Sequence, residues 1–131
     1  MNFAYTILYV PDVAASLAFF DKAFGLKTRF LHESGAYGEV DTGTGGTTLA
    51  FVDHATARDG VQHDYVAASS STQPLGMEIG FTVTDVQAAY DRAVAAGARA
   101  LAAPVTKPWG QTVAYVRCPD GCLVELCTAM G

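Results

Sequence analysis

The chain has 131 residues, of which half are hydrophobic and 16% are charged, and its formal net charge is -5 at pH 7. These values are typical of one globular domain with a substantial core, and they exclude a disordered chain. The negative charge argues against a nucleic-acid partner, because phosphate binding needs a basic face, and no Lys/Arg cluster suits a membrane surface. Because no apolar run could span a bilayer and no export signal is present, we expect a cytoplasmic protein.

The first 52 residues predict a strand, a helix and three further strands. Residues 3–10 alternate in character as a strand does, and Asp12 then marks the N-cap of a helix. Apolar residues recur at helical spacing after Asp12, and Gly25 ends the helix. Three short strands, separated by glycine-containing turns, follow at residues 26–33, 37–42 and 47–52.

Residues 53–74 show no sustained period and include a small, polar run at 67–72. We interpret them as a connecting loop between two halves of the chain. A long loop in a small domain is either a plain linker or the lid or rim of a site, and both interpretations stay open.

The same order of elements returns in residues 75–131. In the strand 77–83, Glu78 and its alternate neighbours lie opposite an apolar face, and a buried strand does not accommodate a carboxylate without a partner or a use. Asp85 caps a helix that ends at Gly97. Three strands follow at residues 99–103, 111–117 and 122–128, the last two joined by a Pro-Asp-Gly turn.

The two halves superpose along the sequence. Asp85 follows Asp12 by 73 residues, and Glu78 follows Tyr5 by the same interval. An internal duplication of this kind is typical of a fold built from two similar modules. We therefore predict an α+β fold of two βαβββ modules, whose curled mixed sheets form a shared cleft. The modules are residues 1–52 and 75–131, joined by the loop 53–74.

Two sequence runs, together with this duplication, carry a family resemblance. The runs are Val-Pro-Asp-Val-Ala-Ala-Ser-Leu-Ala-Phe-Phe at 10–20 and Cys-Pro-Asp-Gly-Cys-Leu-Val-Glu-Leu at 118–126. Over residues 1–131, the chain resembles the vicinal oxygen chelate superfamily, which includes glyoxalase I, bleomycin resistance proteins and extradiol dioxygenases. The resemblance implies a single domain of paired modules around a cleft. It also implies a homodimer, because the related families commonly form one.

In the metal-dependent members, the resemblance places ligands at four positions, which here are Tyr5, Ala50, Glu78 and Glu125. Glu125 suits a ligand and Glu78 stands where histidine is usual, but Ala50 has no donor and a phenol is rarely a ligand outside iron sites. Two carboxylates make a weak site at best, so we expect no cofactor, with a weakly held divalent metal at Glu78 and Glu125 as the alternative.

The three histidines of the chain fall at strand ends or in the loop: His32, His54 and His63. The pattern of two histidines and one carboxylate that a dioxygenase needs is therefore absent.

The predicted ligand-binding residues lie on inward strand faces or at the cleft rim: Tyr5, Ile7, Tyr9, Phe51, Glu78, Trp109, Tyr115 and Glu125. Ala50 is the alternative to Phe51, and for the strand 111–117 either face could line the cleft. Aromatic walls with one or two carboxylates suit a flat ligand that carries amine or amide donors, such as an antibiotic or a hydroxylated aromatic.

Three functions remain open. The favoured one is a metal-free module that binds or sequesters a small aromatic or antibiotic-like molecule. The second is a lyase or isomerase resembling glyoxalase I, with a metal held by Glu78 and Glu125. The third is a metal-free enzyme in which Glu78 or Glu125 is the catalytic general base. If these carboxylates lie close together without a metal, their repulsion should raise the pKa of one of them.

Overall fold

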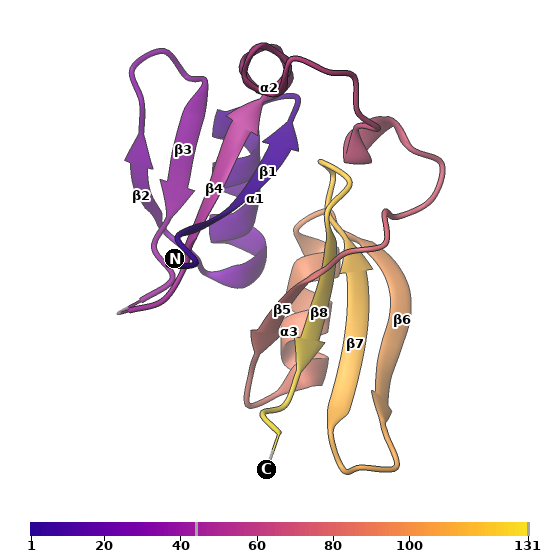
Figure 1. The fold of residues 1–131 in the computed structure, drawn as a ribbon. Coiled ribbons are helices and arrows are strands. Elements are labelled where there is room, and N and C mark those ends of the chain that lie inside the picture. The colour runs from indigo at the N-terminus through magenta and orange to yellow at the C-terminus, as the bar shows by residue number, and fades with distance from the viewer. Residues whose placement is uncertain (44, 131) are drawn as a thin grey trace.

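The computed structural model describes residues 1–43 and 45–130, and these residues form two four-stranded sheets. The N-terminal sheet has the order β1 (Tyr5–Val10), β4 (Thr48–Asp53), β3 (Tyr37–Val40) and β2 (Thr28–Leu31). The C-terminal sheet repeats it with β5 (Ile79–Thr82), β8 (Leu123–Cys127), β7 (Thr112–Arg117) and β6 (Arg99–Thr106). In each sheet one outer strand pairs in parallel and the other pairs are antiparallel. The predicted duplication is confirmed (Figure 1).

Each sheet carries one long helix on one face, α1 (Val13–Phe24) or α3 (Val86–Ala95). The predicted N-caps are confirmed, because Asp12 and Asp85 each accept a hydrogen bond from the backbone N–H three residues on, at 3.1 and 3.0 Å. Gly25 ends α1 with a φ of 72°, a conformation that costs glycine little. These caps fix where the apolar stripe of each helix meets its sheet.

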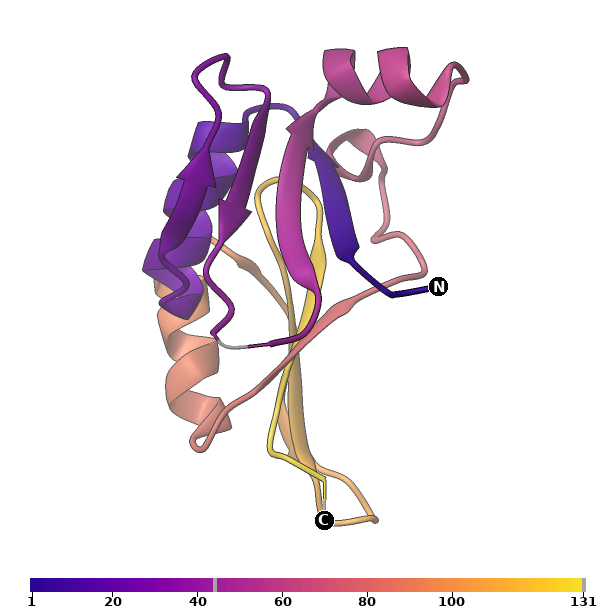
Figure 2. The same cartoon turned by 60° about the vertical axis from the view of Figure 1, so that its left-hand side comes forward.

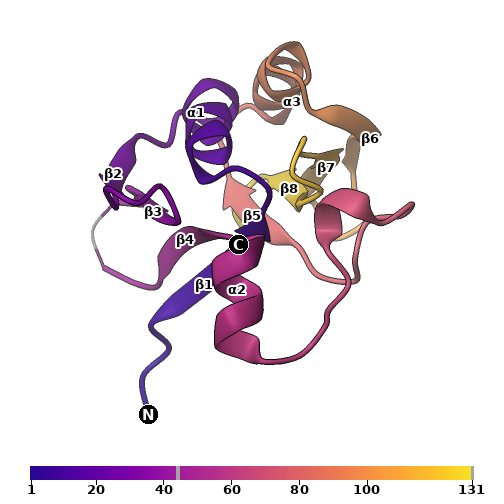
Figure 3. The same cartoon turned by 90° about the horizontal axis from the view of Figure 1, so that it is seen from above.

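The two helices lie side by side on one side of the molecule (Figures 2 and 3). Arg92 of α3 joins them, since its guanidinium donates to the backbone carbonyls of Lys22 at 2.9 Å and Asp21 at 3.3 Å. The opposite face of each sheet, here called the helix-free face, points away from the helices. Figure 3 shows the two helix-free faces diverging toward the lower left and lower right, so the two sheets do not close on one another within one chain.

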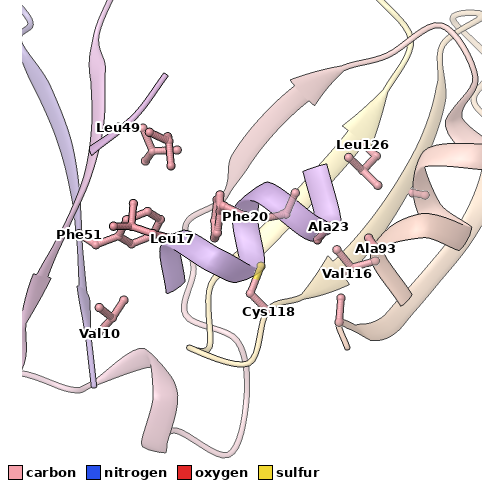
Figure 4. Close-up of a cluster of buried hydrophobic side chains, with 14 of the residues drawn as sticks. Val10, Leu17, Phe20, Ala23, Leu49, Phe51, Ala93, Val116, Cys118 and Leu126 are labelled. Carbon is pink, nitrogen blue, oxygen red and sulfur yellow. The ribbon is translucent and has the colours of Figure 1, made fainter. Parts of the chain in front are cut away.

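The core surrounds α1, which lies between the two sheets (Figure 4). Phe20 is fully buried there, with its ring 4.9 Å from that of Phe51 and 5.1 Å from that of Phe24. The core side chains that Figure 4 labels around α1 include Val10, Leu49 and Phe51 on one side and Ala93, Val116 and Leu126 on the other. One continuous core therefore joins both modules, and it fixes the position of β1 relative to β5.

The connecting loop is more regular than we predicted. Residues 53–74 contain the helix α2 (His54–Val61) and the short 3₁₀ helix η1 (Ala68–Ser70). Asp53 caps α2 by accepting from the backbone N–H of Thr56 at 2.8 Å. The sequence signal is weak because Ala57 is the buried residue of this helix and Gly60 lies in its last turn. None of the helices in the described part of the chain is long and apolar enough to cross a membrane.

Strand β6 is also longer than predicted, since it continues through Pro104 rather than stopping before it. β6 is an edge strand, where proline is tolerated because the missing N–H can face away from the sheet. The pairing with β7 shifts register between Ala102 and Val105, which is where the proline lies.

Gly121, in the turn between β7 and β8, allows η1 to approach closely. Its φ is +94°, and a Cβ there would lie 2.2 Å from the carbonyl oxygen of Ala68. We expect Gly121→Ala to lower the free energy of unfolding by about 2–4 kcal/mol, because the two backbones must separate around a strained residue. Denaturant titration measures this. The matched control is Gly110→Ala, with the same φ and no atom near the new methyl group; equal losses in the two variants would contradict the explanation.

Candidate functional site

A cavity of about 370 Å³ lies between β1 and the edge of the C-terminal sheet at which β5 and β8 begin. Its walls come from β1, from the connecting segment and from the first residues of β5 and β8, and they include Ile7, Tyr9, Tyr65, Met77, Glu78 and Leu123. The lining is mainly apolar and aromatic. This volume and lining suit a small organic molecule, since such sites combine apolar walls with a few polar groups.

A cluster of polar side chains lies beside this cavity, on the helix-free face of the C-terminal sheet. The pairing of β8 places Glu125 between Gly80 of β5 and Tyr115 of β7. The phenol of Tyr115 donates to the carboxylate of Glu125 at 3.3 Å. Glu78, just before β5, lies close enough to Glu125 for their carboxyl groups to share a hydrogen bond. We call Glu78, Tyr115 and Glu125 the carboxyl cluster.

The environment of this cluster favours the protonated form of Glu78. Burial raises the pKa of Glu78, and the negative charge of Glu125 and the hydrogen bond with its carboxyl raise it further. Burial also raises the pKa of Tyr115, as do the charges of Glu125 and then Glu78. The thiol of Cys127 has a raised pKa for the same reasons, burial first and then the two carboxylates. A cationic or hydrogen-donating ligand would relieve this concentration of negative charge.

Five of the predicted site residues lie in this region. Ile7, Tyr9 and Glu78 line the cavity, while Tyr115 and Glu125 form the carboxyl cluster with Glu78. The structure also decides which face of strand 111–117 is available, because Tyr115 pairs with Glu125 on the helix-free face.

The other three predicted residues lie elsewhere. Phe51 is 0% exposed in the core against Phe20, so its prediction as a ligand contact is corrected: Ala50, paired with Ile7, lies on the helix-free face instead. Trp109 is 65% exposed at the tip between β6 and β7, where its indole N–H donates to the side chain of Gln111, away from the cavity. Tyr5 is 56% exposed at the start of β1 and is not among the residues that line the cavity.

A second polar network, which the sequence did not reveal, lies on the helix-free face of the N-terminal sheet. Glu39 accepts hydrogen bonds from the phenol of Tyr37 at 2.5 Å and from the guanidinium of Arg29 at 3.1 Å, and Arg29 also donates to Thr48 at 3.0 Å. Burial, with the hydrogen bond to Glu39, raises the pKa of Tyr37 to about 12, and the nearby Tyr5 adds to this shift. The alternation of Tyr37 and Glu39 in the sequence indicated that the two side chains share a face of β3. The irregularity in β2 at Arg29, which brings the guanidinium to Glu39, has no signal in the sequence.

The comparisons with known proteins agree with this architecture. The family model of the Glyoxalase/Bleomycin resistance protein/Dioxygenase superfamily matches residues 2–126. The chain belongs to this superfamily. No match is found among curated proteins.

Solved structures of other proteins show the same fold. A glyoxalase-related enzyme from Fulvimarina pelagi is 24% identical, with 98% of this chain and 88% of that chain covered and a TM-score of 0.82. A glyoxalase/bleomycin resistance protein/dioxygenase family enzyme from Burkholderia phytofirmans PsJN is 23% identical over 99% of this chain and all of that one, with a TM-score of 0.78. TioX from Micromonospora sp. ML1 is 20% identical over 98% of both chains, with a TM-score of 0.70. At these identities the likeness concerns the fold alone.

The side chains of this member do not fit the metal site of the metal-dependent superfamily members. Of the four ligand positions, Ala50 is a buried methyl group without a donor, and Tyr5 lies outside the cavity. Within residues 1–43 and 45–130, no three His, Cys, Asp or Glu side chains lie close enough to share an ion. Glu78 and Glu125 remain as two neighbouring carboxyls, fewer donors than a tightly held divalent ion requires.

Proposed function

We propose that this superfamily member is a metal-free small-molecule-binding protein. Its ligand is a flat aromatic or antibiotic-like molecule that carries a cationic or amine group, and it binds in the cavity between β1 and the carboxyl cluster. The observation that carries this proposal is the position of Glu78, which lines the mainly apolar cavity and also lies beside the carboxylate of Glu125.

The two parts of the site support two parts of such a ligand. Tyr9 and Met77 offer apolar and aromatic surface, against which a planar ring can pack. The carboxyl cluster offers acceptors to an amine, and charge-assisted hydrogen bonds are stronger than neutral ones. The carboxyl cluster contains no histidine nitrogen that could bind a metal ion. It therefore suits recognition of an amine better than metal catalysis.

A binding titration with two tricyclic probes tests this function. Proflavine is planar and cationic and carries two amines, whereas anthracene-2-carboxylate has a similar shape and the opposite charge. We expect proflavine to bind with one site per chain in the presence of a chelator, and the anionic probe to bind far more weakly. Equal affinities for the two probes, or proflavine binding that requires an added divalent metal, would contradict the proposal.

The raised pKa of Glu78 favours one alternative, a metal-free enzyme in which Glu78 or Glu125 moves a proton. This alternative depends on the pairing of the two carboxyls, because the charge of Glu125 helps Glu78 to hold a proton at a pH where an isolated carboxyl is ionised. Glu125→Gln should therefore lower the pKa of Glu78, which carboxyl-carbon NMR measures. An unchanged titration of Glu78 in that variant would remove the basis for proton transfer.

We also propose that the chain forms a homodimer. The helix-free faces carry exposed apolar side chains, among them Tyr5, Ile7 and Phe30, which a second copy would cover. The divergence of these faces within one chain leaves them available to a partner with the same surface. Sedimentation equilibrium should give twice the mass of the chain, and Phe30→Asp should shift the protein toward the monomer. A wild-type protein that is monomeric at high concentration would contradict this assembly.

A further inference from the structure

Tyr65, in the segment that follows α2, forms part of the cavity wall. Its hydroxyl lies 2.6 Å from Nδ1 of His54, the first residue of α2. Its ring lies 5.1 Å from the ring of Tyr9 at an interplanar angle of 57°, and the guanidinium of Arg58 lies 5.0 Å from its centroid. Side chains from β1 and α2 thus hold Tyr65 against the cavity.

His54 has an unusual environment for a histidine that the sequence indicated only as a loop residue. Its Nε2 is buried and finds no hydrogen-bond partner among the described residues. A neutral imidazole can exchange one hydrogen bond with Tyr65 and leave Nε2 uncharged. A protonated imidazole carries an N–H on both nitrogens, so it would bury a charged donor without an acceptor, which is unfavourable.

The two largest influences on the pKa of His54 also favour its neutral form. Burial lowers the pKa of His54, and the positive charge of Arg58 lowers it further, while the carboxylate of Asp53 opposes them. With the phenol of Tyr65, these are the charged and titratable groups that face His54 from β4, α2 and the connecting segment; Tyr9 of β1 packs on Tyr65. Because the folded-state pKa lies below the ordinary value of 6.5, the contact is most stable above pH 6.5 and weakens as the pH falls through the folded-state pKa.

The far end of the same segment is held differently. Arg117 of β7 donates to the backbone carbonyl of Ala68 at 2.7 Å and to that of Ser71 at 3.0 Å. A guanidinium stays charged throughout the pH range in which histidine titrates. The part of the cavity wall between Tyr65 and Ala68 is therefore held at one end by His54, whose charge depends on pH. At the other end it is held by Arg117, whose charge does not.

We propose that Tyr65 contacts the ligand of the cavity and that His54 is a positioning residue, which holds Tyr65 in place while its imidazole is neutral and releases it when protonated. Ligand affinity then falls as His54 takes up a proton. The part that concerns the ligand rests on the proposed function, whereas the contact between His54 and Tyr65 can be tested without any ligand.

Hydrogen–deuterium exchange of residues 64–68 at pH 8 and pH 5 tests the contact. After correction for the intrinsic effect of pH, exchange in the wild-type protein should be roughly tenfold faster at pH 5. In His54→Asn, an amide replaces Nδ1 and cannot be protonated, so the corrected rates should be equal at both pH values. His63→Asn, an exposed histidine of the same segment, should behave as the wild-type protein does. The same pH dependence in His54→Asn as in the wild-type protein would overturn the assignment.

Proflavine binding tests the contribution of Tyr65 to the site. Between pH 8 and pH 5 its dissociation constant should rise more for the wild-type protein than for His54→Asn, because both proteins contain the carboxyl cluster and only one contains an imidazole at position 54. Tyr65→Phe keeps the ring but loses the hydrogen bond, so it should bind more weakly at pH 8 and follow the pH profile of His54→Asn. Identical pH profiles for the wild-type protein and His54→Asn would overturn the inference.

The two measurements separate the possible failures. If proflavine does not bind at any pH, the proposed function is contradicted, while the exchange experiment still decides whether His54 holds Tyr65. If proflavine binds but exchange does not depend on His54, the positioning role is overturned and the proposed function stands. Circular dichroism of each variant at pH 8 confirms that it is folded, and Tyr65→Phe provides the second variant if His54→Asn is not.

Discussion

Replacing Phe20 by alanine should lower the free energy of unfolding by about 3–5 kcal/mol, as is usual when a fully buried aromatic ring is removed. The ring is 0% exposed and packs edge-on against Phe51 and Phe24. Because α1 lies between the two sheets, the empty space would open where both modules meet (Figure 4). Urea denaturation, followed by circular dichroism, measures the loss.

The control for this substitution is Val94→Ala. Val94 is 38% exposed on α3, outside the faces proposed for the dimer, so its truncation should cost less than about 1 kcal/mol. A loss in Val94→Ala that equals the loss in Phe20→Ala would contradict the position of the core.

The double variant Glu78→Gln, Glu125→Gln should bind proflavine about 10- to 100-fold more weakly, because it loses a charge-assisted hydrogen bond. The wild-type protein should bind more tightly as the pH rises through the raised pKa of Glu78, since the carboxylate then gains its charge. The double variant should lack this part of the pH dependence. Isothermal titration calorimetry at several pH values measures both effects.

Glu33→Gln is the control for long-range charge effects. Glu33 is exposed in the turn between β2 and β3, and its substitution removes a negative charge far from the carboxyl cluster. It should leave proflavine affinity unchanged at moderate salt, because exposed charges beyond a Debye length are screened. A comparable loss of affinity in Glu33→Gln would show that only net charge, and not the carboxyl pair, attracts the dye.

The fold was predictable from the sequence because its signals are local and repeated. Asp12 and Asp85 mark the helix starts, and the alternation of Glu78 and Gly80 with apolar residues shows which side of β5 is buried. The repeat then predicts the same succession of strands and helix in both halves. Each of these inferences depends on neighbours in the chain rather than on distant contacts.

The site was less predictable because it depends on register and on irregular segments. The strand β4 reads Leu49-Ala50-Phe51-Val52, which is apolar on both faces, so the alternation rule could not separate Phe51 from Ala50. Only the pairing of Ala50 with Ile7 decides it. The contact of His54 with Tyr65 joins a helix start to a segment without any period, and no pattern in the sequence indicates such a contact.

A crystal structure of the chain with proflavine tests the central claim most directly. The account predicts the dye in the cavity, its ring packed against Tyr65 and Tyr9, and an amine within hydrogen-bonding distance of Glu78 or Glu125. A dye bound outside the cavity, or a transition metal held between the two carboxylates in place of the amine, would contradict the account.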